Sequence, residues 1–336
     1  MISGGWKRRR NIGGRCARLT PVSRRGWLLF LAMSVIWGIP YLLIRVAVRD
    51  FPPEVLVFAR TAPPALLLMA YAAYRGMLRP LLPHWRMLLL YSLVELAGPW
   101  LMLSHAEVRL SSSLAALLIA ATPLVAAVLA RLVGRERIDR RRLLGLVVGV
   151  GGVVALAGVD VHADDLTAVA VVLLTAVGYA VGPFLVSRRL SHLPTLGVIA
   201  SSLAVVAVLY APFAVWHWPD EISRDSALSV VVLSVVCTAF AFIVFFALIA
   251  EAGPARASVI TYVNPAVALV LGVLLLDEPL TLGIAIGFPL VLLGSVLATS
   301  RPRRSPSPPR DGSPLPGLRA APAGAAAPAG LAPEPS

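Results

Sequence analysis

Residues 111–158 read SSSLAALLIAATPLVAAVLARLVGRERIDRRRLLGLVVGVGGVVALAG, and residues 253–300 read GPARASVITYVNPAVALVLGVLLLDEPLTLGIAIGFPLVLLGSVLATS. The two stretches align without a gap, 142 positions apart (111 to 253). The alignment pairs two prolines, two glutamates and four glycines: Pro123 with Pro265, Glu136 with Glu278, Gly145 with Gly287 and Gly152 with Gly294. Each copy predicts an apolar helix with a central proline, a charged turn that carries the glutamate, and a glycine-rich apolar helix. The chain is therefore predicted to contain an internal repeat.

The composition of the chain indicates a membrane protein. Hydrophobic residues make up 58% of it and charged residues 14%, with a mean hydropathy of +0.83. A soluble domain carries about 25% charged residues. The net charge of +13 would suggest a nucleic-acid partner in a soluble protein. In a membrane protein it is read by position along the chain, so no nucleic-acid partner is predicted. Cys16 and Cys237 predict neither a disulfide nor a metal site.

Apolar runs of the length that crosses a bilayer as a helix, about 20 residues, recur ten times. They lie at 27–48, 55–74, 86–105, 112–133, 143–159, 166–187, 194–216, 227–250, 257–276 and 282–299. Each half then holds five spans, and because five is odd the second half enters the membrane in the opposite orientation. The predicted fold is an all-α polytopic membrane protein of ten transmembrane helices in two inverted five-helix repeats. Its predicted domains are a basic cytoplasmic arm (1–26), a first repeat (27–160), a second repeat (161–300) and a disordered cytoplasmic tail (301–336).

The positions of the basic residues predict the orientation of the chain. If the arm is cytoplasmic, the inner segments hold 25 of the 30 Lys and Arg. Five arginines are left for outer loops or helix ends: Arg45, Arg49, Arg60, Arg109 and Arg224. An excess of positive charge on cytoplasmic loops is the rule for membrane proteins. The sequence therefore predicts an inner (plasma) membrane protein with both termini cytoplasmic and the lipid bilayer as its surroundings.

Several motifs in this arrangement resemble the EamA-type branch of the drug/metabolite transporter superfamily. The resemblance covers residues 27–300 and is carried by a short set of motifs: 111–118, Thr122-Pro123, Gly134-Arg135-Glu136, Gly145 and Gly152, then 255–258, Asn264-Pro265, Asp277-Glu278-Pro279, Gly287 and Gly294, and Trp37-Gly38 in the first span. The resemblance implies a bundle around a central cavity in which one half rocks against the other. It also implies secondary transport of a small-molecule substrate such as an amino acid, amine, sugar, nucleotide-linked metabolite or drug.

The predicted activity is export of a small organic metabolite or drug-like solute. No ATP-binding loop is present, so the predicted driving force is a proton gradient or solute exchange. No cofactor and no catalytic residue are predicted, and the chain is compatible with a homodimer. Two alternatives are a membrane-embedded transferase, which would need clustered acids or histidines at one face, and a non-transporting scaffold that recruits partners through the arm and the tail.

Glu95 is the sharpest single signal for a functional site. It lies in the middle of the apolar run 88–105, where an ionisable group costs about 2.5 to 3.5 kcal/mol on insertion scales. Such groups face a cavity or a partner, so Glu95 is predicted to line the cavity and to titrate during transport or hold a cationic substrate group. The alternatives are a structural hydrogen bond to another helix and a pair with Arg60. Cys237 stands at the equivalent position of the second half.

Two helical faces are predicted to line the cavity. On the first span Trp37 and Tyr41 share a face with Ser34 and Arg45, because residues three or four apart stack on a helix. Aromatic belts at the membrane interface are the alternative for this pair. On the ninth span the predicted lining residues are Tyr262 and Asn264, and further predicted substrate-binding residues are Trp100, Tyr179 and Thr238.

Pro123 and Pro265 are predicted hinges. A proline removes one backbone donor, which frees the carbonyl of Ile119 in one half and of Thr261 in the other. Freed polar groups at membrane depth persist only where protein or water satisfies them. The alternative is a simple kink whose carbonyl is bonded by a neighbouring Ser or Thr side chain.

The remaining motifs indicate structure rather than chemistry. Glycines at 145, 149 and 152 and at 283, 287 and 294 follow the small-residue pattern of close helix contacts. The five histidines are scattered singly, so no metal site is predicted.

Overall fold

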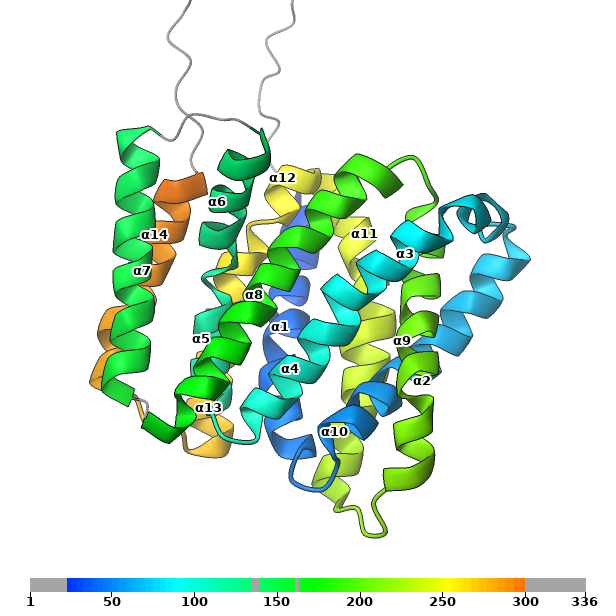
Figure 1. The fold of residues 1–336 in the computed structure, drawn as a ribbon, viewed down its shortest axis with the longest axis horizontal. Coiled ribbons are helices and arrows are strands. Elements are labelled where there is room, and N and C mark those ends of the chain that lie inside the picture. Colours follow the sequence, from blue (N-terminus) through cyan, green and yellow to red (C-terminus); the bar gives the residue numbers. More distant parts are fainter. Residues whose placement is uncertain (1–22, 135–138, 161–162, 300–336) are drawn as a thin grey trace, which may run out of the picture. The chain divides into compact units, whose positions relative to one another are not determined.

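A computed structural model describes residues 23–134, 139–160 and 163–299. Most of the predicted arm, Glu136 and the predicted tail lie outside these residues. Within the described part all regular structure is helical (Figure 1). The helices of the first half are α1 (Arg24–Ala47), α2 (Pro53–Tyr74), η1 (Arg79–His84), α3 (Trp85–Tyr91), η2 (Ser92–Ala97), α4 (Gly98–Glu107), α5 (Ser112–Ile119), α6 (Thr122–Gly134) and α7 (Arg140–Asp160).

The second half follows a similar order. Its helices are η3 (Ala163–Asp165), α8 (Leu166–Leu185), η4 (Val186–Leu190), α9 (Thr195–His217), α10 (Arg224–Ser234), η5 (Val235–Phe240), α11 (Ala241–Ala252), α12 (Pro254–Ala257), α13 (Ile260–Leu276) and α14 (Leu282–Thr299). Four pairs of helices begin 142 residues apart: α1 and α8, α2 and α9, α5 and α12, and α7 and α14. The offset read from the aligned stretches thus extends over both halves.

Nine helical segments of the described chain are long and apolar enough to cross a membrane, which makes the protein an all-helical polytopic membrane protein. They are Arg24–Ala47, Pro53–Tyr74, Arg79–Glu107, Ser112–Leu132, Arg140–Gly158, Ala163–Leu190, Thr195–His217, Arg224–Ala252 and Leu282–Thr299. A further apolar helix, α13, is shorter. The predicted ninth span, 257–276, is interrupted at Ser258 and Val259, where backbone bonds to the third residue back replace the α-helical pattern.

The predicted fourth span is also interrupted, immediately before its proline. Residues Ala120 and Ala121 separate α5 from α6, and Pro123 is the second residue of α6. The Ile119 carbonyl, which Pro123 cannot bond, accepts a hydrogen bond from the Thr122 hydroxyl at 2.7 Å. The Ser295 hydroxyl of α14 donates to the Ala120 carbonyl at 3.2 Å. Side-chain hydroxyls therefore satisfy the carbonyls at this break.

The glycines of α7 and α14 bring these two helices into backbone contact. A Cβ added at Gly152 would lie 2.6 Å from the Val291 nitrogen and 2.8 Å from the Gly287 oxygen. A Cβ added at Gly145 would lie 2.8 Å from the Gly294 oxygen. The later glycine of one helix meets the earlier glycine of the other, so α7 and α14 run antiparallel. The predicted role of these glycines in close helix contact is confirmed.

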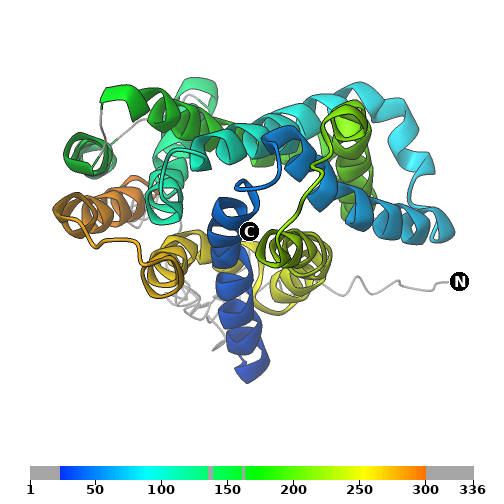
Figure 2. The same ribbon diagram turned by 90° about the horizontal axis from the view of Figure 1, so that it is seen from below.

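The other helices pack as related pairs around α1 and α8. Helix α2 lies along α9, while α1 packs on α10, α11 and α13 and α8 packs on α4 and α6 (Figures 1 and 2). The largest apolar cluster joins residues of both halves, including Ile44, Leu117, Val172, Leu233 and Val291. The interior of the bundle is therefore shared between the two halves.

The α7–α14 contact predicts a large difference between two adjacent glycines. Gly152→Ala places a methyl group against the backbone of α14, whereas a Cβ at Gly151 meets nothing within 4 Å. Overpacking of this kind costs about 1–3 kcal/mol. We expect Gly152→Ala to lower the melting temperature of the purified protein and Gly151→Ala to leave it unchanged or slightly raised. Equal melting temperatures for the two variants would contradict the backbone contact.

Candidate functional site

Glu95 lies in a π-helical turn, η2, and the second half has a π-helical turn, η5, at nearly the same place. In a π-turn the backbone bonds to the fifth residue back, and such turns are frequent at functional sites. In η5 the Thr238 hydroxyl donates to the Leu233 carbonyl, five residues back, at 2.8 Å. The structure thus places Thr238 in a bond within its own helix, beside the buried Cys237.

The Glu95 carboxylate points from η2 toward α8. A Cβ added at Gly182 would collide with the Glu95 carboxylate, so only glycine fits there beside it. Oxygen Oε2 is buried and has no hydrogen-bond partner among the described residues. Tyr91 and Tyr179 lie within electrostatic range of Glu95. The two alternatives to a cavity-lining role for Glu95 were a structural hydrogen bond and an ion pair with Arg60. Among the described contacts, Oε2 makes neither.

Arg60 does not lie at a helix end, so its assignment to an outer loop or helix end is wrong. It is the eighth residue of α2 and only 4% exposed. Its guanidinium lies over the Trp100 ring, 3.9 Å from the ring centroid. Its Nε atom has no hydrogen-bond partner among the described residues. A count of charges along the sequence does not reveal this depth, because Arg60 lies close to the beginning of the predicted apolar run 55–74.

Three predicted residues meet around this arginine. Trp100 lies under the guanidinium, and Tyr41 of α1 and Tyr179 of α8 lie within electrostatic range of it. The Trp100 indole also approaches the Tyr179 hydroxyl. We call Arg60, Tyr41, Trp100 and Tyr179 the Arg60 cluster. Because Tyr179 is also within electrostatic range of Glu95, the cluster and the Glu95 carboxylate are neighbours.

The structure places the other predicted residues outside the Arg60 cluster. Trp37 packs on Phe245 and Phe242 of α11, with ring centroids 4.8 and 6.4 Å away. The Tyr262 hydroxyl lies 2.9 Å from the Thr299 hydroxyl of α14. In the amide orientation that satisfies its neighbours, Asn264 donates to the Ile260 carbonyl and to the Ser34 carbonyl of α1 at 2.9 and 3.2 Å. Asn264 thus links α13 to α1.

Glu107 is a buried acid that the sequence reasoning missed. It is the last residue of α4, it is 0% exposed, and neither carboxylate oxygen has a hydrogen-bond partner among the described residues. Arg45 donates to the backbone carbonyls of Glu107 and Val108 at 2.6 and 3.0 Å. The predicted third span ended at residue 105, which put Glu107 into a loop. The sequence signal for its burial was the position of Glu107 directly after the predicted apolar run 86–105.

Glu278 joins the second half of the chain to the first. Its two carboxylate oxygens accept hydrogen bonds from the backbone N–H groups of Ser112 and Ser113, at 2.7 and 3.0 Å, and from both serine hydroxyls. The carboxylate therefore caps the N-terminus of α5, where backbone donors are unsatisfied and negative charge is favourable. We call the side of the bundle where α1, α4 and α13 end and α5 and α10 begin the Glu278 side.

A second contact on the Glu278 side also joins the halves. The Ser223 hydroxyl and backbone N–H, which precede α10, donate to the Asp50 carboxylate at 2.5 and 2.8 Å. These hydrogen bonds hold the pKa of Asp50 below its usual range. Asp50 follows α1 in the first half. The loops of both halves are thus bonded to each other on this side.

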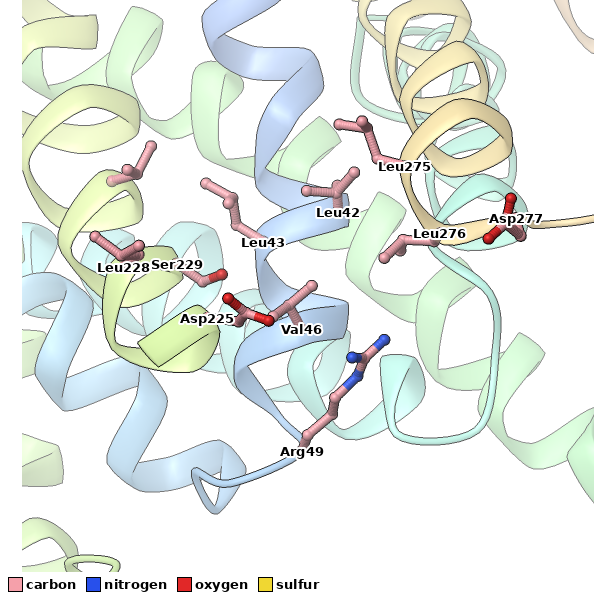
Figure 3. A pocket seen from close by; sticks show the side chains of 11 residues that line it. Leu42, Leu43, Val46, Arg49, Asp225, Leu228, Ser229, Leu275, Leu276 and Asp277 are labelled. Carbon is pink, nitrogen blue, oxygen red and sulfur yellow. The ribbon is translucent and has the colours of Figure 1, made fainter. Parts of the chain in front are cut away.

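A pocket of ≈ 440 Å³ opens between α1, α10 and α13 on the Glu278 side (Figure 3). Arg49 and Asp225 point toward it from the end of α1 and the start of α10. Its lining is mostly aliphatic: Leu42, Leu43, Val46, Arg49, Asp225, Leu228, Ser229, Val232, Leu275, Leu276 and Asp277. None of the predicted site residues belongs to this lining.

A bundle of apolar spans that keeps charged and aromatic side chains in its interior is typical of membrane transporters. The sequence pattern of the EamA-like transporter family matches residues 24–158 and again residues 166–300. The chain belongs to the EamA-like transporter family, which points to a transporter rather than an enzyme.

Named relatives agree with this assignment, and a solved structure shares the fold. The chain is 28% identical to the uncharacterized inner membrane transporter YedA of Escherichia coli (strain K12), over 82% of this chain and 93% of that protein. It is 27% identical to a probable terminal-alkyne amino-acid exporter of Streptantibioticus cattleyicolor, over 86% of this chain and 99% of that protein. A crystal structure matches 82% of this chain and 96% of its own, with a TM-score of 0.58 and 22% identity, which shows a shared fold.

The cap on α5 predicts a loss of stability when the Glu278 charge is removed. Glu278→Gln keeps one acceptor oxygen but loses the charge and the second acceptor. We expect the free energy of unfolding to fall by about 1–2 kcal/mol, the range for helix caps and charges at helix termini. Thermal unfolding of the purified protein measures this change.

The matched control is Glu251→Gln. Glu251 accepts a hydrogen bond from the Ser23 hydroxyl at 2.5 Å, but it is exposed, so its substitution should leave the melting temperature close to that of the native chain. If both variants lost the same stability, the Glu278 carboxylate would have no special role at α5.

Proposed function

We propose that this protein is a secondary exporter of a small organic solute, built from ten spans in two inverted five-helix repeats that alternate between two open states. The observation that carries this proposal is the antiparallel α7–α14 contact. Gly145 and Gly287 are equivalent in the two halves, as are Gly152 and Gly294. Gly145 meets Gly294 and Gly152 meets Gly287. A contact in which equivalent residues exchange roles across antiparallel helices is the relation that a twofold axis between inverted halves produces.

In this proposal α12 and α13 together form one crossing, the predicted ninth span. This crossing and the nine longer segments make ten. The two helices are separated only by Ser258 and Val259, and α13 ends on the Glu278 side, from which α14 returns. The proposed bending points are Pro123, directly after the interruption at Ala120 and Ala121, and Pro265, which lies inside α13 downstream of the interruption at Ser258 and Val259. They suit alternating access, because a broken helix bends at lower cost than a continuous one.

The charge distribution and a relative support the proposed membrane and orientation. The basic residues assigned to cytoplasmic segments support an inner membrane location with both termini cytoplasmic. The relative from Escherichia coli carries an inner membrane name. The Glu278 side would then face outward, and the loop contacts there would close that side.

Export of a small metabolite is supported by the names of two relatives. One is the amino-acid exporter described above, and another is a probable amino-acid metabolite efflux pump of Salmonella typhimurium (strain LT2), 25% identical over 77% of this chain and 90% of that protein. We propose coupling to protons through Glu95. A buried carboxylate with an unpartnered oxygen can take up a proton at low energetic cost, because the neutral form is the one that low polarity favours.

Proton coupling predicts that Glu95→Gln abolishes pH-driven transport. The amide keeps the shape of the side chain but cannot release a proton. A thermal-shift screen of amino acids, amines, nucleosides and sugars first identifies a ligand, because a bound ligand raises the melting temperature. Flux of that ligand into proteoliposomes is then measured with and without an imposed pH gradient, and only the pH-driven part should disappear.

Glu54→Gln is the control for this experiment. Glu54 lies at the start of α2 and pairs with His105 at 2.9 Å, away from the unpartnered interior groups. Its substitution should preserve pH-driven flux. Unchanged pH-driven flux in folded Glu95→Gln would remove Glu95 from the coupling mechanism.

A further inference from the structure

Arg60 is a cation inside the bundle with Glu107 within electrostatic range but with no described carboxylate at ion-pair distance. Its side chain is 4% exposed, and no described carboxylate forms an ion pair with it. A buried charge that lacks a close partner is strongly destabilising. Cations within spans face a cavity or a pathway far more often than they serve packing alone. The position therefore calls for a ligand of opposite charge.

The surroundings of Arg60 fix its orientation. The Trp100 ring covers one face of the guanidinium at 3.9 Å, a geometry that combines stacking with cation–π attraction. Stacking uses the face of the guanidinium and leaves the N–H groups on its edge free to donate. The Nε atom has no acceptor among the described residues. The arginine is therefore held in place while part of its donor edge is unused.

Polar groups from several helices lie near Arg60. Tyr41 comes from α1, Tyr179 from α8 and Cys237 from η5, and each lies within electrostatic range of Arg60. Both halves of the chain thus contribute to the surroundings of one arginine. The pocket of Figure 3 offers no comparable group, because its lining is mostly aliphatic and its charged residues lie at the ends of helices.

We propose that Arg60 binds the carboxylate of the transported solute, so that the substrates of this protein are organic monocarboxylates. This inference rests on the proposed transport function. A carboxylate presents two oxygens in one plane, which matches two parallel N–H groups of a guanidinium. The buried acids Glu95 and Glu107 lie near the Arg60 cluster, so the site carries one cation among acids and suits a monoanion better than a phosphate dianion.

Matched pairs of solutes test the proposal on the full chain purified in detergent. Benzoate and L-leucine carry a carboxylate, and benzamide and L-leucinamide are the same molecules with that group neutralised as an amide. We expect the two carboxylates to raise the melting temperature and the two amides to leave it unchanged. Phenyl phosphate should also leave it unchanged.

Substitutions then assign the effect to Arg60. Loss of hydrogen bonds to a charged group should weaken carboxylate binding by about 10- to 100-fold in Arg60→Gln. Arg60→Lys keeps the charge but loses the two parallel N–H groups of the guanidinium, so its affinity for carboxylates should lie between those of the native chain and Arg60→Gln. It also tests the proposal if Arg60→Gln fails to fold. Arg75→Gln is the control, because Arg75 ends the same helix, lies 5.9 Å over Tyr71 and is exposed. It should bind carboxylates as the native chain does.

The outcomes separate this inference from the proposed function. No stabilisation by either carboxylate, equal stabilisation by the amides, or native affinity in Arg60→Gln overturns the carboxylate site. If a carboxylate binds through Arg60 but does not cross proteoliposome membranes, the site stands and the transport proposal falls. If a carboxylate crosses at the same rate in the native chain and in Arg60→Gln, transport stands and the site falls.

Discussion

A charge inside a lipid-embedded bundle loses its hydration, and the surrounding groups must compensate for that loss. This constraint determines how the interior of the protein is arranged. Arg60, Glu95 and Glu107 each have side-chain atoms that are buried without a hydrogen-bond partner among the described residues. An aromatic ring lies under Arg60, and two arginines lie within electrostatic range of Glu107. Gly182 gives the Glu95 carboxylate space but no opposite charge. None of these contacts fully compensates a buried charge. The proposed proton and carboxylate sites are placed at these atoms for that reason.

The frame of the bundle is symmetric, whereas its chemistry is not. Four pairs of helices begin at the same offset in the two halves, and both halves carry a π-helical turn in the same span. Among the described residues, the three charged side chains with buried unpartnered atoms, Arg60, Glu95 and Glu107, all belong to the first half. At the equivalent positions of the second half stand Ser202, Cys237 and Ile249. A frame of two similar halves can exchange conformations at low energetic cost, while one set of charges defines a single site.

The sequence predicted the repeat, the helical membrane fold and three of the four residues of the Arg60 cluster. These depend on composition, apolar run length and internal alignment, which are visible in one chain. The depth of Arg60 and the burial of Glu107 were missed because both lie near the ends of apolar runs, where helix boundaries are uncertain by several residues. The π-helical turn η2 could not be predicted from the sequence either. On a regular helix Glu95 and Trp100 point in different directions, but bonding to the fifth residue brings residues five apart closer to one face.

The glycine contact between α7 and α14 limits how far the two halves could diverge after a gene duplication. Because Gly145 touches Gly294 and Gly152 touches Gly287, each ancestral glycine position occurs on both sides of the contact. A larger side chain introduced in either copy would push against the backbone of the other, so neither copy could drift alone. The α7–α14 contact, which holds none of the proposed site residues, would then keep its ancestral glycines. The solute-facing positions of the two copies could become specialised.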